Sequence, residues 1–204
     1  MLIMTRDQGE QLISPLAKNF AELTLAAWQD WITSPFAPQL QKKTVRANLV
    51  WNQIIARGKT HFHGHPTVRV DKMREWDGFV IDSRVFVRPK YAQDGLHARN
   101  YPTPSALDYH DQDLDLFRGI SRLDLIYTLD PLETAIERIA VVQRHKKAVA
   151  WTIDLMGNSD TGQEFITFTP SAPSGSPADR IIKPKRHGEN NAVQPRKRSG
   201  GEDV

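Results

Sequence analysis

Three histidines occur at alternate positions, His61, His63 and His65, at the end of a predicted helix. On an extended segment, alternate side chains point to one side, so these imidazoles could bind zinc or a similar ion. This pattern is the basis of one alternative function, a metal-dependent nuclease or hydrolase. Gly64 and Pro66 instead favour a surface loop, and no carboxylate motif of a known metal enzyme follows. We therefore predict no metal site and no cofactor.

Carboxylates and basic residues follow this segment at spacings that are common in soluble proteins. A nuclease centre needs acids and a lysine that converge on a metal ion, and residue types alone do not establish one. The sequence also lacks the glycine-rich phosphate loops, the nucleophile elbow and the zinc-protease helix motif. A protein that is not an enzyme is therefore favoured. The carboxylates and basic residues considered for such a nuclease centre are Asp71, Glu75, Asp77, Asp82, Lys72, Arg88 and Lys90.

Basic and aromatic residues are mixed in one further stretch, which contains Arg84, Phe86, Arg88, Lys90 and Tyr91. Such a mixture can form a surface for nucleic acid. The simpler interpretation, which we favour, is a sheet with one buried and one solvated face.

The most specific pattern is the hexapeptide Gln-Asp-Leu-Asp-Leu-Phe at 112–117. A match to its Gln, Leu, Leu and Phe positions is expected by chance in roughly one in several hundred chains of this length. Leu114, Leu116 and Phe117 either close the core beneath a loop or point outward as an anchor for another protein. The flanking acids and the terminal Leu-Phe pair favour exposure, in a loop without regular structure.

This hexapeptide resembles the Q-x-L-x-L-F peptide with which bacterial replication proteins bind the β sliding clamp. The resemblance implies that Gln112 hydrogen-bonds at the mouth of the clamp pocket, and that Leu114, Leu116 and Phe117 fill its apolar groove. Asp115 belongs to the same predicted partner-binding segment. In such short anchors a few large side chains supply most of the affinity. A single peptide of this kind binds at about micromolar strength, or ~8 kcal/mol.

The order of elements around the hexapeptide resembles that of SocB-like proteins, small bacterial toxins of the SocAB toxin–antitoxin system. A segment at 99–103, Arg-Asn-Tyr-Pro-Thr, leads through a predicted short helix into the hexapeptide, and strands follow. The resemblance implies a toxin that inhibits DNA replication by competing with polymerase subunits for the clamp. It also implies a SocA-like antitoxin that delivers the toxin to the ClpXP protease.

Two helices are predicted to precede these segments. Ser14-Pro15 is typical of a helix start, and apolar residues recur at helical spacing from Leu16 to Trp31. A second helix is predicted from Lys42 to Arg57, with Gly58 as its C-terminal stop.

Short alternating segments predict strands in the rest of the body. Asp77-Gly78 and Asp82-Ser83 are typical of turns, Pro89 is expected to end a strand, and Thr103-Pro104 to cap a short helix over 105–110. The expected strands lie at about 67–73, 78–81, 85–87, 123–129, 136–142 and 149–155. The predicted fold class is α+β, with two N-terminal helices packed on a twisted, mostly antiparallel sheet of about six strands.

With 204 residues, the chain is long enough for one α+β domain, 1–156, and an appendage, 157–204. Hydrophobic content of 39% and charged content of 25% are ordinary for a soluble protein. No apolar run is long enough to span a membrane, and no secretion signal begins the chain. The chain has no cysteine, which excludes disulfides and thiolate sites and fits the expected cytoplasmic location.

The appendage is rich in Pro, Ser, Gly, Asn and basic residues, and is predicted to be disordered. Much of the net charge of +3 arises from its lysines and arginines. Such a tail adds weak, salt-sensitive attraction to nucleic acid. A DNA-associated regulatory protein that acts through this tail is therefore the remaining alternative.

Overall fold

A computed structural model describes residues 3–93 and 103–157, and it begins with a helix that the sequence pattern did not predict. This helix, α1, spans Arg6–Ile13 and starts at a capping box in which Thr5 and Gln8 bond each other's backbone N–H. A short 3₁₀ turn, η1 (Ser14–Leu16), joins it to α2 (Ala17–Ile32). A third helix follows α2, so the N-terminal part of the chain contains three helices where two were predicted.

This third helix, α3, spans Lys43–His61 and includes Gly58, which the sequence analysis placed at a helix end. A Cβ atom at Gly58 would lie 2.5 Å from the ring of Phe79. The glycine therefore allows α3 to approach the sheet closely, and the prediction of a C-terminal stop at this residue is wrong.

The predicted α+β fold class is confirmed by a sheet of six strands in the order β1-β2-β3-β4-β5-β6. Neighbouring strands are antiparallel except β3 and β4, which are parallel. The helix α4 (Pro104–His110) lies between these two strands in the sequence. The strands are β1 (Val68–Met73), β2 (Trp76–Ile81), β3 (Val85–Tyr91), β4 (Ser121–Leu129), β5 (Ile136–His145) and β6 (Ala148–Asp154).

Local turn chemistry was predicted with mixed success. The turn at Asp82–Ser83 is confirmed, and both residues have the positive φ of a two-residue hairpin turn. The turn at Asp77–Gly78 is wrong, because both residues lie in β2 and the chain reverses at Arg74–Glu75. Pro89 does not end β3, which continues to Tyr91. Thr103 caps α4 as expected, since its hydroxyl accepts the backbone N–H of Ala106.

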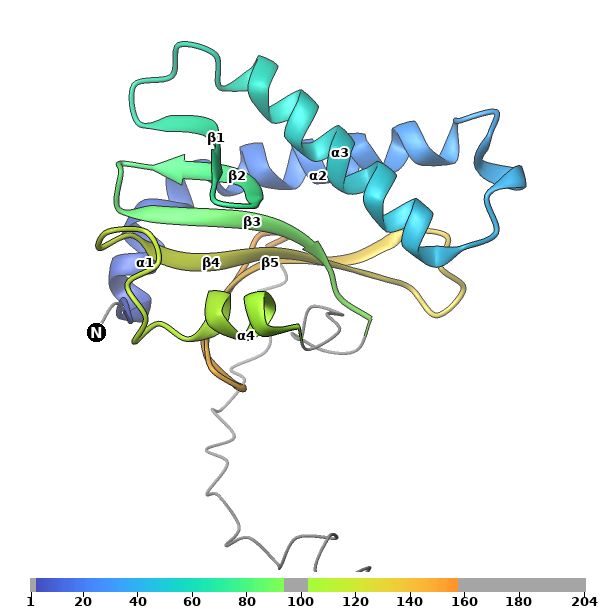
Figure 1. Ribbon diagram of the computed structural model, residues 1–204. Coiled ribbons are helices and arrows are strands. Elements are labelled where there is room, and N and C mark those ends of the chain that lie inside the picture. The colour runs from blue at the N-terminus through green and yellow to red at the C-terminus, as the bar shows by residue number, and fades with distance from the viewer. Residues whose placement is uncertain (1–2, 94–102, 158–204) are drawn as a thin grey trace, which may run out of the picture. The chain divides into compact units, whose positions relative to one another are not determined.

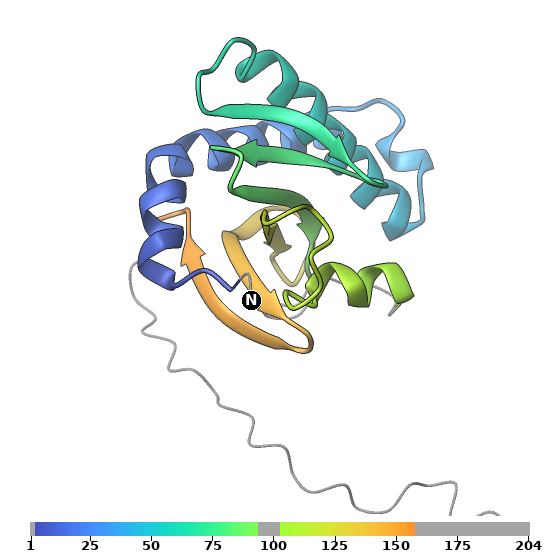
Figure 2. The same ribbon diagram turned by 60° about the vertical axis from the view of Figure 1, so that its left-hand side comes forward.

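Both faces of the central strands are covered (Figure 1). α2 and α3 lie over one face, where the larger apolar core cluster forms. α4 and the loop at 111–120 lie over the opposite face, where Val80, Phe86, Tyr109 and Phe117 form a second cluster (Figures 1 and 2). Every residue of β4 is buried. The predicted solvated face is therefore wrong for this part of the sheet.

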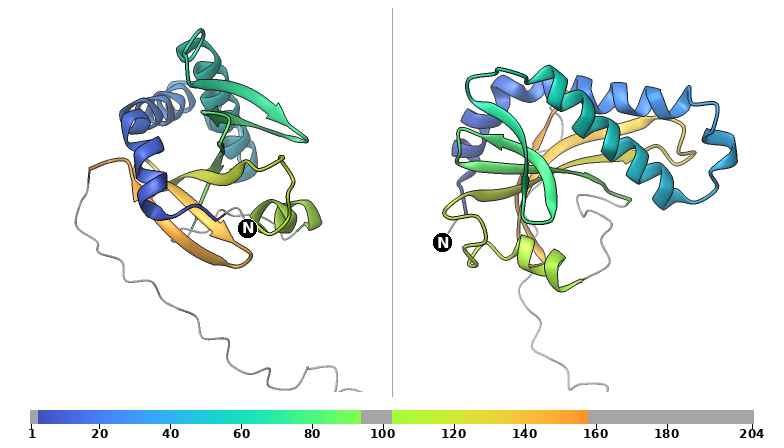
Figure 3. Two further views of the ribbon diagram at one scale, coloured as in Figure 1. Left: turned by 90° about the vertical axis from the view of Figure 1, so that its left-hand side faces the viewer. Right: turned by 45° about the horizontal axis from the view of Figure 1, so that its top comes forward.

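The β5–β6 hairpin packs against the N-terminal helix α1 (Figure 3). Trp151 of β6 packs over Gly9, and its indole N–H donates to the carbonyl oxygen of Met4 at 2.8 Å. No helix in the described part of the chain is long and apolar enough to cross a membrane. The segments 99–102 and 158–204, and with them nearly all of the predicted disordered tail, lie outside the described residues.

Candidate ligand-binding cleft

A cleft opens where β2 and β3 separate. These strands pair only at three positions, Phe79–Ile81 against Val85–Val87, before β2 continues along β1 and β3 continues along β4. Gly78 lies at the fork, where a Cβ atom would come within 2.5 Å of the Val87 carbonyl oxygen. The cleft has a volume of about 420 Å³. Its walls are Lys43, Thr44, Ala47, Asn48 and Trp51 of α3, with Glu75, Trp76, Asp77, Arg88, Pro89, Lys90 and Tyr91.

Two cationic residues of β3, Arg88 and Lys90, line the cleft. Burial and the positive charge of Arg88 lower the pKa of Lys90 to about 8. Lys43 lies on the opposite wall, but its ammonium group is 2.6 Å from the carboxylate of Glu133. Because the surroundings of Lys90 disfavour its charge, a bound anion would stabilise the protonated form.

Arg88 is held in place by the neighbouring strand β4. Its Nε and Nη2 atoms donate to Oδ1 of Asp124 at 3.1 and 2.9 Å. The guanidinium carbon lies 3.6 Å from the centroid of the Tyr109 ring. The exposed fractions of the Arg88 and Asp124 side chains are 3% and 1%. Breaking such a buried pair leaves an uncompensated charge, so the guanidinium position is strongly fixed.

Asp124 also contacts α4 through its second carboxylate oxygen, which lies 2.8 Å from Nε2 of His110. Burial raises the pKa of Asp124, but Arg88 and His110 together bring it well below its ordinary value of 3.8. The carboxylate is therefore charged at neutral pH. The sequence analysis missed Asp124, His110 and Tyr109. A charged residue within the apolar strand predicted at 123–129 was the available signal.

The acids considered for a nuclease centre are spread over several elements. Glu75 and Asp77 line the cleft with the two cations of β3. Asp71 instead pairs with Arg69 on β1, and Asp82 forms the β2–β3 turn. Glu75 and Asp77 can accept hydrogen bonds from amines or hydroxyls of a bound molecule.

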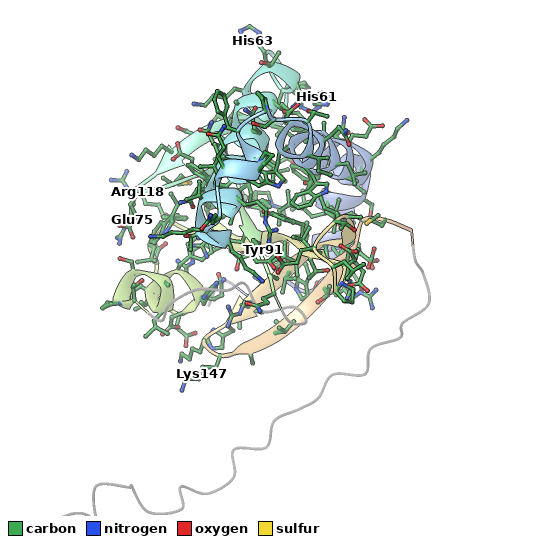
Figure 4. All side chains as sticks on the ribbon, turned by 90° about the vertical axis from the view of Figure 1, so that its right-hand side faces the viewer. His61, His63, Glu75, Tyr91, Arg118 and Lys147 are labelled. Atoms are coloured by element: carbon green, nitrogen blue, oxygen red, sulfur yellow. The ribbon has the colours of Figure 1, made fainter. Side chains whose placement is uncertain are left out.

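The H-x-H-x-H segment does not form a common ligand face. His61 lies in the last turn of α3, so the segment is not extended, and Nδ1 of His65 accepts the backbone N–H of Val68. Figure 4 shows His61 and His63 at one end of the molecule, far from Glu75 and Tyr91.

Among the described residues, the only potential metal cluster is Asp111, Asp113 and His145, whose ligand atoms lie within 4.8 Å of one another. The ammonium group of Lys146 already bonds Asp113 at 3.0 Å. Lys146 therefore offsets part of the negative charge of this cluster.

Gln112, the first residue of the hexapeptide, is fully buried. Its amide nitrogen donates to the carbonyl oxygens of Arg122 and Arg144 at 2.9 and 3.1 Å, and its amide oxygen accepts the backbone N–H of Arg122. The Arg122 guanidinium in turn donates to the carbonyl oxygens of Leu114 and Asp111. The hexapeptide is thus bonded to the beginning of β4 and the end of β5.

Phe117, the last residue, is only 3% exposed and packs on Phe86 and Trp76, with ring centroids 5.3 and 5.8 Å apart. Leu116 is half-buried, whereas Leu114 is 40% exposed. Asp115 is exposed and its carboxylate accepts the backbone N–H of Gly119. Of the three apolar residues expected to be exposed, only Leu114 is exposed, and the expectation is wrong for Phe117 and for the half-buried Leu116. Acidic neighbours did not turn Phe117 outward, because Phe86 and Trp76 offer an apolar surface beneath it.

Residues 112–117 in this arrangement are hereafter called the docked hexapeptide. Docking limits the use of the hexapeptide as an anchor for another protein. Exposing a buried aromatic side chain costs about 2–3 kcal/mol, and each lost hydrogen bond of Gln112 costs about 1 kcal/mol more. If release of the hexapeptide from the sheet costs ~5 kcal/mol, the affinity of a micromolar peptide for its partner falls by roughly 1,000- to 10,000-fold. The docked hexapeptide cannot contact a clamp through Gln112 and Phe117 without this step.

No protein-family model matches the chain, and the searches of curated proteins and of solved structures found no match. The function must therefore be inferred from the site itself.

Proposed function

We propose that the protein binds a small molecule that carries both a planar ring and an anionic group, of the nucleotide class, in the cleft between β2 and β3. The observation that carries this proposal is the position of Arg88, a buried arginine that lines the cleft and is fixed from behind by Asp124. Lys90, whose pKa is lowered, lines the same cleft, and a group with perturbed ionisation in a cleft is a candidate for a functional site.

The cations of the cleft favour an anion. Nε and Nη2 of Arg88 are bonded to Asp124, so Nη1 is the group of this fixed guanidinium that can donate to a phosphate or carboxylate oxygen. Lys90 lies two residues along the same strand and would regain its full charge beside such a group. A phosphate is favoured because it can engage both cations at once.

The aromatic walls favour a ring. Trp51, Trp76 and Tyr91 line the same cleft, and indole and phenol faces stack on heterocycles. Glu75 and Asp77 add acceptors for exocyclic amines or sugar hydroxyls. The volume of about 420 Å³ lies within the usual range for small-molecule sites, roughly 300–1,000 Å³. The proposal assigns binding and no bond-making step.

Isothermal titration calorimetry with AMP, GMP, CMP and UMP tests this proposal, with adenosine and inorganic phosphate as the separate halves. We expect at least one nucleotide to bind about tenfold more tightly than either half. Lys90→Met should weaken this binding about tenfold, the size of one charge-assisted contact. Lys18→Met, which removes an exposed lysine of α2 away from the cleft, is the matched control and should change nothing. Absence of binding by all four nucleotides at millimolar concentration would overturn the proposal.

Binding of the β sliding clamp is a second candidate, favoured by the exposure of Leu114 and by the motif it belongs to. For the protein to bind the clamp, the hexapeptide must undock. The protein would then compete with polymerase subunits for the clamp, and a SocA-like antitoxin would deliver it to the ClpXP protease. Surface plasmon resonance should compare purified clamp binding by the intact protein, by a synthetic 112–117 peptide and by Leu114→Ala. The candidate expects the intact protein to bind and Leu114→Ala to bind more weakly. It fails if the free peptide binds while the intact protein does not.

A further inference from the structure

We infer that occupancy of the cleft controls whether the hexapeptide at 112–117 stays docked. This inference rests on the proposed function and adds a regulatory role to the same site. Two residues, Trp76 and Arg88, each line the cleft and also contact the segment 109–117. The wall of the cleft is therefore partly built on the docked hexapeptide.

Trp76 makes the first connection. It begins β2, next to the Arg74–Glu75 turn, and lines the cleft. Its ring also packs edge-on against Tyr109 and Phe117, with centroids 5.1 and 5.8 Å away. Since β2 has already left β3 at this point, strand pairing to β3 does not hold Trp76 in place. Apart from its backbone pairing with Met73 of β1, its ring position depends on the packing of Tyr109 and Phe117.

Arg88 makes the second connection. Its guanidinium lies over the Tyr109 ring at 3.6 Å, and Nη2 lies 3.4 Å from Nε2 of His110. Tyr109 and His110 end α4, directly before the hexapeptide. Tyr109 is itself tied to β4, since its hydroxyl donates to the carbonyl oxygen of Leu123 at 2.8 Å. Undocking that also displaces Tyr109 would remove the stacking partner of Arg88 while leaving its bonds to Asp124.

These shared contacts fix the sign of the coupling. A ligand that uses Trp76 and Arg88 as they stand binds the docked form more tightly than the undocked form. By linkage, the ligand suppresses undocking by the same factor by which undocking weakens the ligand. At a ligand concentration of 100 times its dissociation constant, undocking is suppressed up to about 100-fold. An empty cleft is then the state in which the hexapeptide is most easily released.

Hydrogen exchange measured by mass spectrometry tests the coupling on the unmodified protein. The amide N–H groups of Leu114, Leu116 and Ile120 bond within the loop, and that of Arg122 bonds the Gln112 side chain. With the tightest-binding of the four nucleotides present, exchange of these amides should slow by tenfold or more. Helix α1 (Arg6–Ile13), none of whose residues lines the cleft, is the internal control and should be unchanged.

The reciprocal measurement uses Phe117→Leu, which keeps an apolar side chain but removes the ring that supports Trp76. We expect faster exchange at 111–120 and about tenfold weaker nucleotide binding, with the fold retained by circular dichroism. Leu114→Ala changes an exposed residue of the same loop and should leave nucleotide affinity unaltered.

The two proposals fail in different ways. If no nucleotide binds in calorimetry, the proposed function fails before the exchange experiment begins. If a nucleotide binds, but exchange at 111–120 is unchanged and Phe117→Leu binds it as tightly as the wild type, the coupling is wrong and the binding site stands.

Discussion

The two faces of the sheet are held by different kinds of contact. On one face, α1, α2 and α3 pack through a large cluster of aliphatic and aromatic side chains. On the other, α4 and the hexapeptide loop combine a small aromatic cluster with a buried polar network. Apolar packing tolerates small shifts, whereas buried polar groups must keep their partners. The second face is therefore the more sensitive to single substitutions, and it is the face that supports Arg88.

Removal of Asp124 is the strongest test of this difference between the two faces. Asp124→Ala leaves the buried Arg88 without its carboxylate, and we expect a loss of about 3–5 kcal/mol in the free energy of unfolding. Urea unfolding followed by circular dichroism measures this loss.

The matched control is Asp154→Ala, which breaks another Arg–Asp pair. Arg138 and Asp154 lie 2.9 Å apart, but their side chains are 27% and 22% exposed. A pair so accessible to water should contribute no more than about 1 kcal/mol. Equal losses in the two variants would show that burial does not distinguish the two pairs.

A smaller effect is expected at Gln112. Gln112→Leu keeps the volume but leaves two carbonyl oxygens and one backbone N–H without their side-chain partner. We expect a loss of about 2 kcal/mol, within the range for unsatisfied buried groups. Gln41→Leu, at an exposed position before α3, should be neutral in the same urea experiment. A neutral Gln112→Leu would mean that the hexapeptide is not held by this network.

Much of the fold could be predicted from local patterns, and the site could not. Alternation located the strands, and Thr103 identified the start of α4, because these signals lie within a few residues of one another. The contact of Arg88 with Asp124 depends on the parallel pairing of β3 with β4. No local signal specifies that pairing, since 36 residues separate the two partners.

The hexapeptide illustrates the same limit. A short motif records residue types, but whether its side chains point outward depends on what lies beneath them. Phe86 and Trp76 provide an apolar surface, and the carbonyl groups of β4 and β5 provide partners for Gln112. The motif could therefore be recognised from the sequence, while its docking could not.

The smallest expected effect is the pH dependence of nucleotide affinity that arises from Lys90. It tests the cleft without disturbing the buried polar network on the second face of the sheet. The pKa of Lys90 is about 8, so the free protein loses this charge as the pH rises through that value. A nucleotide phosphate has its second pKa near ~6 and is already a dianion at pH 7. Nucleotide affinity should therefore be constant from about pH 7 to 8 and then fall, by up to about tenfold per pH unit, because binding must also supply a proton to Lys90.

Calorimetry at several pH values measures this dependence, and Lys90→Met should bind weakly with no such fall. A decline that persists in Lys90→Met would assign the titration to another group. A flat profile in the wild type would mean that Lys90 does not contact the anion, and would leave Arg88 as its main partner in the cleft.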